Sequence, residues 1–230
     1  MVTRERFAQG MTFDEYVKFV STPENLKREG SFNMPRKDYG DFLRRGFEST
    51  QLNDAQREAW QWIVAQPNGP AKMLVISEEW SSDCRRDVPM LARLAQLGGL
   101  ETRIFPRDGH TISALPVPDP KESPYADVMT PFLRTRDGQT FQSIPIAAFF
   151  TKNFEHLYTY MEFPQIYRKD RVRPALSAPK AGESKEDFAK RSLSEFFAFQ
   201  QSPFFQLYAS AAADEIIAML HERIRVGSLA

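Results

Sequence analysis

The sequence predicts an α/β fold in which a mixed central sheet is accompanied by added helices at both ends of the chain. Three observations support this prediction. Over residues 71–108, an apolar run, a helical segment and a second apolar run follow one another at the spacing of a strand, a helix and a parallel strand. Two β-rich runs within 144–163 are typical of antiparallel neighbours. Helical periodicity occupies residues 1–66 and the segment from 184 onward.

The composition is that of an ordinary globular chain. With 230 residues, of which 42% are hydrophobic, the chain is long enough to bury a substantial core. Lys and Arg number 30 and Asp and Glu number 30, so the balance of charge does not favour a nucleic-acid partner. The basic cluster at 167–173 is short and contains an Asp. The longest apolar runs fall far short of the roughly 20 residues that cross a bilayer, and no membrane span is expected.

A single cysteine indicates the setting in which the protein works. One cysteine cannot form an intramolecular disulfide, and the opening sequence MVTRERFAQG is charged where a signal peptide needs an apolar core. We therefore expect a reducing, cytoplasmic location.

The N-terminal part, residues 1–66, is predicted to be a helical extension. Thr12 and Glu15 have the spacing of a capping box before an apolar-periodic segment. A second helix is expected from Asn53 or Asp54 to Val64, because its apolar residues recur at steps of three and four. The polar segment between them, at 27–42, contains Gly and Pro and is expected to be a loop.

The central part, residues 67–170, is expected to contain the sheet. The run KMLVIS is typical of a buried parallel strand, a helix is predicted at 86–97, and the next strand at 100–108. The proline-rich segment 109–135 is expected to form loops or short helical pieces, and a turn is expected at 136–139.

The C-terminal part, residues 171–230, is predicted to be a linker followed by helices that pack on the core. The linker at 174–184 is rich in Pro, Ala and Ser, and Ser184 is expected to cap the first helix. Pro203 is expected at the first position of the last helix, because its missing N–H is not needed there. Phe204 and Leu220 are among the residues expected to face the core.

Three features that include or follow the cysteine resemble a known pattern. Trp80, Ser81, Ser82, Asp83 and Cys84 stand at the head of the helix that follows the first strand. Pro89 lies five residues after the cysteine, and Ile144–Pro145 opens the first β-rich run. This order resembles the thioredoxin-like superfamily, whose members have Trp-Cys-x-x-Cys, a proline five residues later and a cis proline beside the thiols.

The resemblance covers about residues 71–165 and implies a three-layer α/β/α fold. Within the superfamily the chain is similar to a bacterial branch with a Trp-Cys-Gly-Asp-type motif, because Asp83 occupies the fourth position. The resemblance also implies a cis Pro145 and a binding groove at Trp80, Ser82, Asp83, Ile144 and Pro145. It further implies that Pro89 kinks the helix as a structural device.

Two departures from the family bear on the chemistry. Ser81 occupies the position of the nucleophilic cysteine, and a serine hydroxyl does not attack disulfides usefully. Val75 occupies the position of the family's buried acid. The dithiol–disulfide cycle is therefore not expected within this chain.

The role of Cys84 has two readings. A helix start at Ser81 or Ser82 would place the thiol near the positive end of the helix dipole, beside Arg85 and Arg86, which lowers a thiol pKa. The alternative is a small buried residue packed under Trp80. For Ser81 itself, a helix N-cap is favoured over a ligand-binding role.

Three functions remain open from the sequence. The first is a divergent single-cysteine protein, at most a weak or monothiol oxidoreductase, that forms a mixed disulfide with a protein or small-thiol partner through Cys84. The second is a non-catalytic binding module that uses the groove or the added helices. A lesser alternative is a glutathione-transferase-like enzyme that holds glutathione near Ser81, which is the one cofactor considered. The three histidines lack metal-ligand spacing, so no metal is expected. The aromatic runs are expected in the core or at an interface between copies of the chain.

Overall fold

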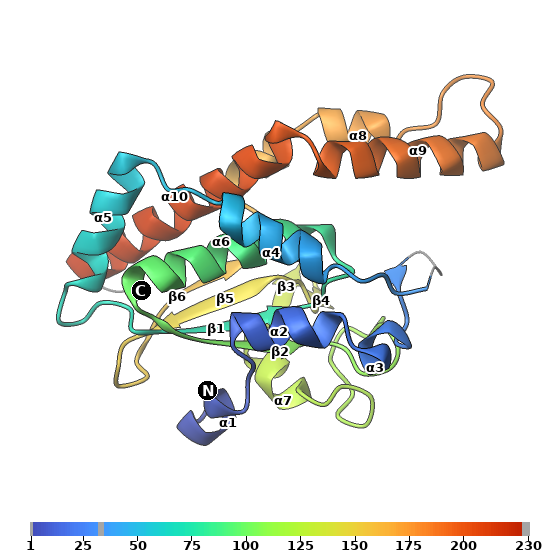
Figure 1. Cartoon of the computed structure of the whole chain (residues 1–230). Helices are drawn as coiled ribbons and strands as arrows, with labels where there is room; N and C mark the ends of the chain where they lie inside the picture. Colours follow the sequence, from blue (N-terminus) through green and yellow to red (C-terminus); the bar gives the residue numbers. More distant parts are fainter. Residues whose placement is uncertain (1, 32–34, 227–230) are drawn as a thin grey trace.

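A four-stranded mixed sheet forms the centre of the protein. The structure is a computed structural model that describes residues 2–31 and 35–226. The sheet has the order β2-β1-β5-β6, as Figure 1 shows. Its strands are β1 (Lys72–Ser77), β2 (Glu101–Pro106), β5 (Ile146–Phe150) and β6 (His156–Met161). A separate two-stranded hairpin consists of β3 (Arg134–Arg136) and β4 (Gln139–Phe141).

The pairing of the strands confirms the βαβ unit and the later hairpin. β1 runs parallel to β2, with Val75 opposite Ile104, and antiparallel to β5, with Val75 opposite Ala147. β5 and β6 are antiparallel neighbours. The turn expected at 136–139 is present, and it joins β3 to β4, two short strands that the sequence did not predict.

Helices flank both faces of the sheet. The α-helices are α1 (Arg4–Ala8), α2 (Phe13–Val20), α3 (Pro23–Leu26), α4 (Gly40–Ser49), α5 (Asp54–Val64), α6 (Ser82–Gly98), α7 (Ala126–Met129), α8 (Val172–Leu176), α9 (Lys185–Gln200) and α10 (Pro203–Arg225). Two short 3-10 helices are η2 (Thr130–Phe132) and η3 (Gln165–Lys169). Figure 1 shows α4, α5, α6 and α10 on one side of the sheet and α1 and α7 on the other. α9 extends away from the sheet and packs against α8 and α10.

Local sequence signals explain where several helices begin. The Thr12–Glu15 and Asn53–Gln56 capping boxes are formed, and Ser184 accepts from the Asp187 amide. Pro203 stands in the first turn of α10. The long helix α6 ends at Gly99, whose positive φ of 65° provides a left-handed C-cap.

Trp60 on α5 anchors the added N-terminal helices to the sheet layer. Its side chain is fully buried, and its Nε1 donates to the carbonyl oxygen of Leu94 on α6 at 2.8 Å. Its ring lies edge-on to Phe149 on β5, with 6.5 Å between the centroids. One side chain thus joins α5, α6 and the sheet in a single hydrophobic core.

Two expectations about the helices need correction. The segment 27–42 was expected to be a loop, but α4 begins inside it at Gly40. Gly46 lies where α4 meets α6, since a Cβ there would stand only 3.0 Å from Pro89 Cγ. In α10, Phe204 was expected to face the core, yet it is 64% exposed while Phe205 is 1% exposed. At the N-terminal end of α10, the residue that faces the core is therefore Phe205 and not Phe204.

The linker expected at 174–184 is partly helical, because α8 reaches Leu176. Arg191 on α9 donates to the carbonyl oxygens of Leu176 and Ala178 and pairs with Glu183, so side-chain contacts fix this connection to the helix that follows it.

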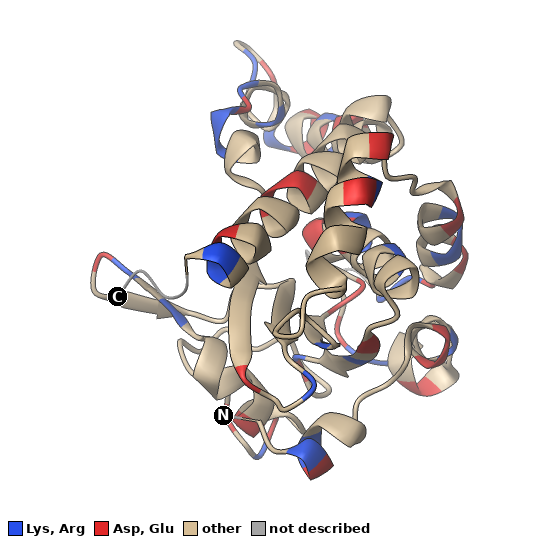
Figure 2. Ribbon diagram, turned by 90° about the vertical axis from the view of Figure 1, so that its left-hand side faces the viewer, with Lys and Arg blue, Asp and Glu red and all other residues tan. Residues whose placement is uncertain are grey.

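The N-terminal segment reaches the edge of the sheet. Met11 forms an antiparallel bridge with Ile104 on β2, with N–O distances of 2.9 and 2.7 Å. Both charge signs are distributed along the ribbon, in keeping with the balanced composition (Figure 2). In the part of the chain that the structure describes, no helix is long and apolar enough to cross a membrane.

Candidate functional site

A groove opens at the end of the sheet where β1 passes into α6. It has a volume of about 840 Å³ and is lined by Trp80 and Ser81 on one side. Leu115, Phe141 and Ile144 line it further along. Leu115 is 55% exposed and Phe141 is 41% exposed, so apolar surface faces the opening. The chain thus presents a partly apolar groove that includes Trp80 and Ile144, two of the five residues that the resemblance implies for a binding groove.

Polar contacts fix the wall of the groove around Trp80. The indole Nε1 donates to Asp108 Oδ2 at 3.1 Å, and the Arg107 guanidinium lies 5.3 Å from the indole centroid. Arg107 also donates to the carbonyl oxygen of Gln142 at 2.9 Å. These contacts hold the Trp80 side chain and the segment before β5 in a fixed relation.

The segment that precedes β5 borders the groove with free backbone groups. The Ile144–Pro145 peptide bond is cis, and the Pro145 carbonyl accepts from the Glu162 amide at 2.8 Å. Within residues 2–31 and 35–226, no hydrogen bond engages the N–H or the C=O of Ile144. An extended chain placed alongside could pair with both groups, as a neighbouring strand does.

The structure brings together only some of the residues predicted for the site. Trp80, Ser81 and Ile144 line the groove, whereas Ser82, Asp83 and Pro145 do not. Ser82 is the first residue of α6, and Asp83 forms an ion pair with Arg86 at 2.8 Å. Pro89 lies inside α6 and faces α4.

Ser81 is the N-cap of α6. Its Oγ accepts from the Cys84 amide at 3.4 Å, and its backbone adopts the extended conformation of a cap. This is the role that the sequence favoured for Ser81.

Cys84 lies in the core beneath this cap. The side chain is fully buried, and its Sγ accepts a hydrogen bond from the Glu78 amide at 3.5 Å. Burial raises the pKa of the thiol to about 12, against smaller lowering effects of the hydrogen bonds from Glu78, Ser77 and Ser81. At neutral pH the sulfur is therefore a protonated thiol without access to solvent, which is typical of an inert structural cysteine.

Arg85 and Arg86 do not bring the pKa of Cys84 below its ordinary value as the sequence suggested, because the effect of burial dominates. Arg85 donates to the carbonyl oxygens of Glu79 and Trp80 at 2.7 Å and to the Gln200 side chain. Arg86 pairs with Asp83 and Asp87. Both guanidiniums are thus directed to other partners.

We expect Cys84 to resist alkylation in the native protein. At pH 7.5 a pKa of about 12 reduces the thiolate fraction by roughly a thousandfold relative to a free cysteine, and burial removes access as well. Mass spectrometry after exposure to iodoacetamide should show no adduct over hours in buffer and complete labelling in guanidinium. If Cys84 of the native protein were labelled within minutes, the thiol would be reactive and the monothiol function would be favoured.

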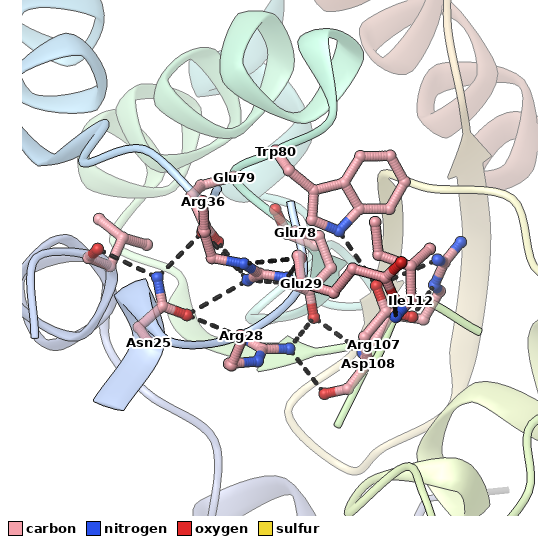
Figure 3. Close-up of polar contacts among 12 residues, drawn as sticks. Asn25, Arg28, Glu29, Arg36, Glu78, Glu79, Trp80, Arg107, Asp108 and Ile112 are labelled. Carbon is pink, nitrogen blue, oxygen red and sulfur yellow. Dashed lines mark hydrogen bonds and ion pairs between the residues drawn. The ribbon is translucent and has the colours of Figure 1, made fainter. Parts of the chain in front are cut away.

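A buried network of charges, which the sequence gave no reason to expect, closes the end of β1. Arg36 donates to Glu78 at 2.8 Å and to Glu79 at 3.0 Å, and all three side chains are fully buried. Arg28 pairs with Glu78 at 2.7 Å. Figure 3 shows Asn25 bridging Arg28, Arg36 and Glu79 in the same cluster. The network fastens Asn25, Arg28 and Arg36 to the loop that bears Trp80.

Two features of this network matter for the site. Glu78 accepts from the Asp108 amide at 2.7 Å, so the charges also fix the loop whose carboxylate holds Trp80. Burial raises the pKa of Glu78, and the Asp108 and Glu79 carboxylates add to the rise, while Arg28 and Arg36 oppose it. A charged Glu78 in the core therefore depends on these arginines.

A second buried cluster joins α6 to the C-terminal part. Asp87 forms two hydrogen bonds with Arg86, at 2.7 and 2.8 Å, and accepts from the Tyr160 hydroxyl at 2.8 Å. Burial raises the pKa of Asp87 to about 6, against the opposing effect of Arg86. The Arg86 guanidinium lies over the rings of Tyr167 and Phe205. The cluster fixes the C-terminal helices to the start of α6.

The histidines occur singly. His221 contacts Trp62 edge-on and His156 bonds to Thr159. Among residues 2–31 and 35–226, no group of three or more His, Cys, Asp or Glu side chains is placed to hold a metal ion.

Comparison with known proteins supports the fold. A family model described as Thioredoxin matches residues 34–115. Among solved structures, a protein of unknown function from Pseudomonas aeruginosa is similar, with a TM-score of 0.55, 16% identity and coverage of 96% of this chain and 98% of that one. An HIV epitope scaffold is similar with a TM-score of 0.53 and 17% identity, covering 96% of this chain and 98% of its own. A search among curated proteins found no match. The sheet, its flanking helices and these likenesses show a thioredoxin-like fold.

Proposed function

We propose that the protein is a thioredoxin-fold binding module that docks an extended segment of a partner protein in the groove beside Trp80. The observation that supports this most directly is the backbone of Ile144, whose N–H and C=O have no partner among the described residues and border the groove. Backbone pairing gives affinity to an extended ligand, and side-chain pockets on either side give specificity. Leu115 and Phe141 supply apolar surface for such a ligand.

The side chains that form the wall of the groove are held in place before a ligand binds. Trp80 is held through Asp108, and Asp108 is held in turn through the buried Glu78. Because these groups are already ordered, a ligand would not have to immobilise them on docking.

The burial of Cys84 disfavours a mixed disulfide as the main activity. A partner sulfur would have to reach a side chain that is fully buried, and the groove-lining position next to Trp80 is the hydroxyl of Ser81. As part of the same proposal, we group the chain with the branch whose motif has Asp in the fourth position, because Asp83 stands there. The single cysteine also favours a reducing, cytoplasmic setting for this binding role.

The groove can be tested with a displayed library of random dodecapeptides. We expect the wild-type protein to select peptides that bind it in solution, and Leu115→Asp to weaken that binding about tenfold or more, because a carboxylate would replace apolar surface in the groove. Val117→Asp is the matched control. Val117 is 48% exposed two residues away and does not line the groove.

Hydrogen exchange gives an independent readout of the same event. The Ile144 amide is expected to gain protection when a selected peptide binds, since it would acquire a backbone partner. Failure to select any binder, or equal losses in Leu115→Asp and Val117→Asp, would contradict the proposal.

A further inference from the structure

A second pocket adjoins the groove and is unusually rich in arginine. It has a volume of about 470 Å³ and shares Phe141, Ser143 and Glu162 with the groove. Its guanidiniums come from β3 and from the segment after β6, namely Arg134, Arg136, Arg168, Arg171 and Arg173. We call these five residues the arginine pocket. In a chain with equal numbers of acidic and basic residues, this is a local concentration of positive charge.

The carboxylates in and beside the arginine pocket leave part of this charge uncompensated. Glu162 forms an ion pair with Arg134. Asp170 accepts from the backbone amides of Val172 and Arg173, at 2.9 and 3.3 Å. Arg136 pairs with Asp137, next to it in sequence, at 3.3 Å. With these three carboxylates against five guanidiniums, an excess of two positive charges remains.

Three of the arginines are free to take an anionic ligand. In the described part of the chain, no salt bridge engages Arg168, Arg171 or Arg173. The Nε of Arg173 is buried and has no hydrogen-bond partner there. An unpaired buried donor is costly, which is consistent with a guanidinium held in place without a protein acceptor.

Aromatic rings hold two of these guanidiniums in place. Arg173 lies 4.9 Å from the Tyr167 centroid, and Arg168 lies 5.6 Å from that of Phe163. A guanidinium packed on a ring still presents its N–H edge, which matches a carboxylate with two parallel hydrogen bonds. The arginine pocket is therefore partly ordered before a ligand arrives.

We infer that the segment bound in the groove is acidic and places Asp or Glu side chains in the arginine pocket. This inference rests on the proposed function, because the groove would hold the backbone of the segment while the arginine pocket would select its charge. The shared wall at Phe141 and Ser143 allows one extended chain to occupy both hollows. An acidic segment also complements the excess charge that the protein itself leaves unpaired.

The dodecapeptide library tests this inference separately from the binding role. Selected peptides should be enriched in Asp and Glu, and replacing these residues by Asn and Gln in a selected peptide should weaken binding at least tenfold. The double variant Arg168→Gln/Arg171→Gln should lose a similar factor and show a weaker dependence of affinity on salt. Arg44→Gln/Arg45→Gln, which removes the same charge from the exposed surface of α4, should bind as the wild type does.

The possible outcomes separate the two proposals. Binders without acidic enrichment, whose affinity is unchanged in Arg168→Gln/Arg171→Gln, would overturn the inference and leave the groove proposal standing. No binders at all would overturn both. Inorganic phosphate is the remaining probe. If it binds the arginine pocket in the micromolar range by calorimetry while acidic peptides do not, the pocket takes a free anion and the peptide assignment is wrong.

Discussion

Arg36→Met is expected to lower the free energy of unfolding by about 3–5 kcal/mol, the usual cost of removing one partner of a buried ion pair. Arg36 donates to both Glu78 and Glu79, and the three side chains have no exposed surface. Met fills much of the same volume, so the loss reports lost charge pairing rather than a cavity: Glu79 is left without a cationic partner, and Glu78 keeps only Arg28. Chemical denaturation monitored by circular dichroism at neutral pH measures it.

The pH dependence of Arg36→Met distinguishes lost charge pairing from lost packing. The pKa of Glu78 already lies above its ordinary value of 4.5 because of burial, and removing Arg36 raises it further. A folded state that holds a proton more tightly than the unfolded state gains stability as the pH falls. The difference between variant and wild type should therefore shrink as the pH is lowered from 7 toward 4.5.

An exposed ion pair provides the control for this experiment. Arg57 pairs with Asp54 on α5, with side chains that are 50% and 92% exposed. Arg57→Met should change the free energy of unfolding by less than about 1 kcal/mol. A loss for Arg36→Met as small as this, or one that does not change with pH, would contradict the assigned role of the network.

Trp60→Ala is expected to destabilise the protein by about 3–5 kcal/mol, in the range found for large-to-small changes in a core. The substitution removes a fully buried indole between α5, α6 and β5 and leaves the Leu94 carbonyl without its side-chain donor. The close approach of α6 to the indole also requires a glycine at position 98, because a Cβ there would lie 2.7 Å from the indole nitrogen. Thermal and denaturant unfolding measure the loss.

Trp62→Ala, on the same helix, is the matched control. Trp62 is half-buried, contacts His221 edge-on and lies under the Arg225 guanidinium at 4.5 Å. Because less apolar area is lost, the expected destabilisation is smaller, at about 1–2 kcal/mol. Equal effects of the two substitutions would show that Trp60 does not hold α5 on the core as described.

The elements predicted best from the sequence are those set by local chemistry. The capping residues Thr12 and Ser184 each begin a helix as expected, and the helix expected from Asn53 or Asp54 begins at Asp54. The strands of the central sheet follow from their apolar runs, since a buried strand needs apolar residues on both faces. α4 was missed because it contains Gly40 and Gly46, which disfavour a helix by local propensity. Close contact with Ser21 and Pro89 explains their presence, and that contact is tertiary.

The polar parts of the site could not be read from the sequence for a related reason. Glu78, Glu79 and Arg36 look like surface residues in a linear reading, and their partners are up to 54 residues away. The basic cluster at 167–173 is short and contains Asp170, so the sequence alone does not mark it as a site for an anion. In the structure, backbone amides occupy that carboxylate, and arginines from β3 join the cluster. Only the fold brings such groups together.

The bridge between Met11 and Ile104 also bears on how the protein behaves at high concentration. An exposed edge strand offers unpaired amides and carbonyls on which other copies of a chain can polymerise. Met11 takes up the Ile104 amide and carbonyl on β2, and at the opposite edge α10 packs against β6. The segment between α1 and α2 and the helix α10 thus each occupy part of an outer strand, which leaves less of the sheet edges available for pairing with another copy of the chain.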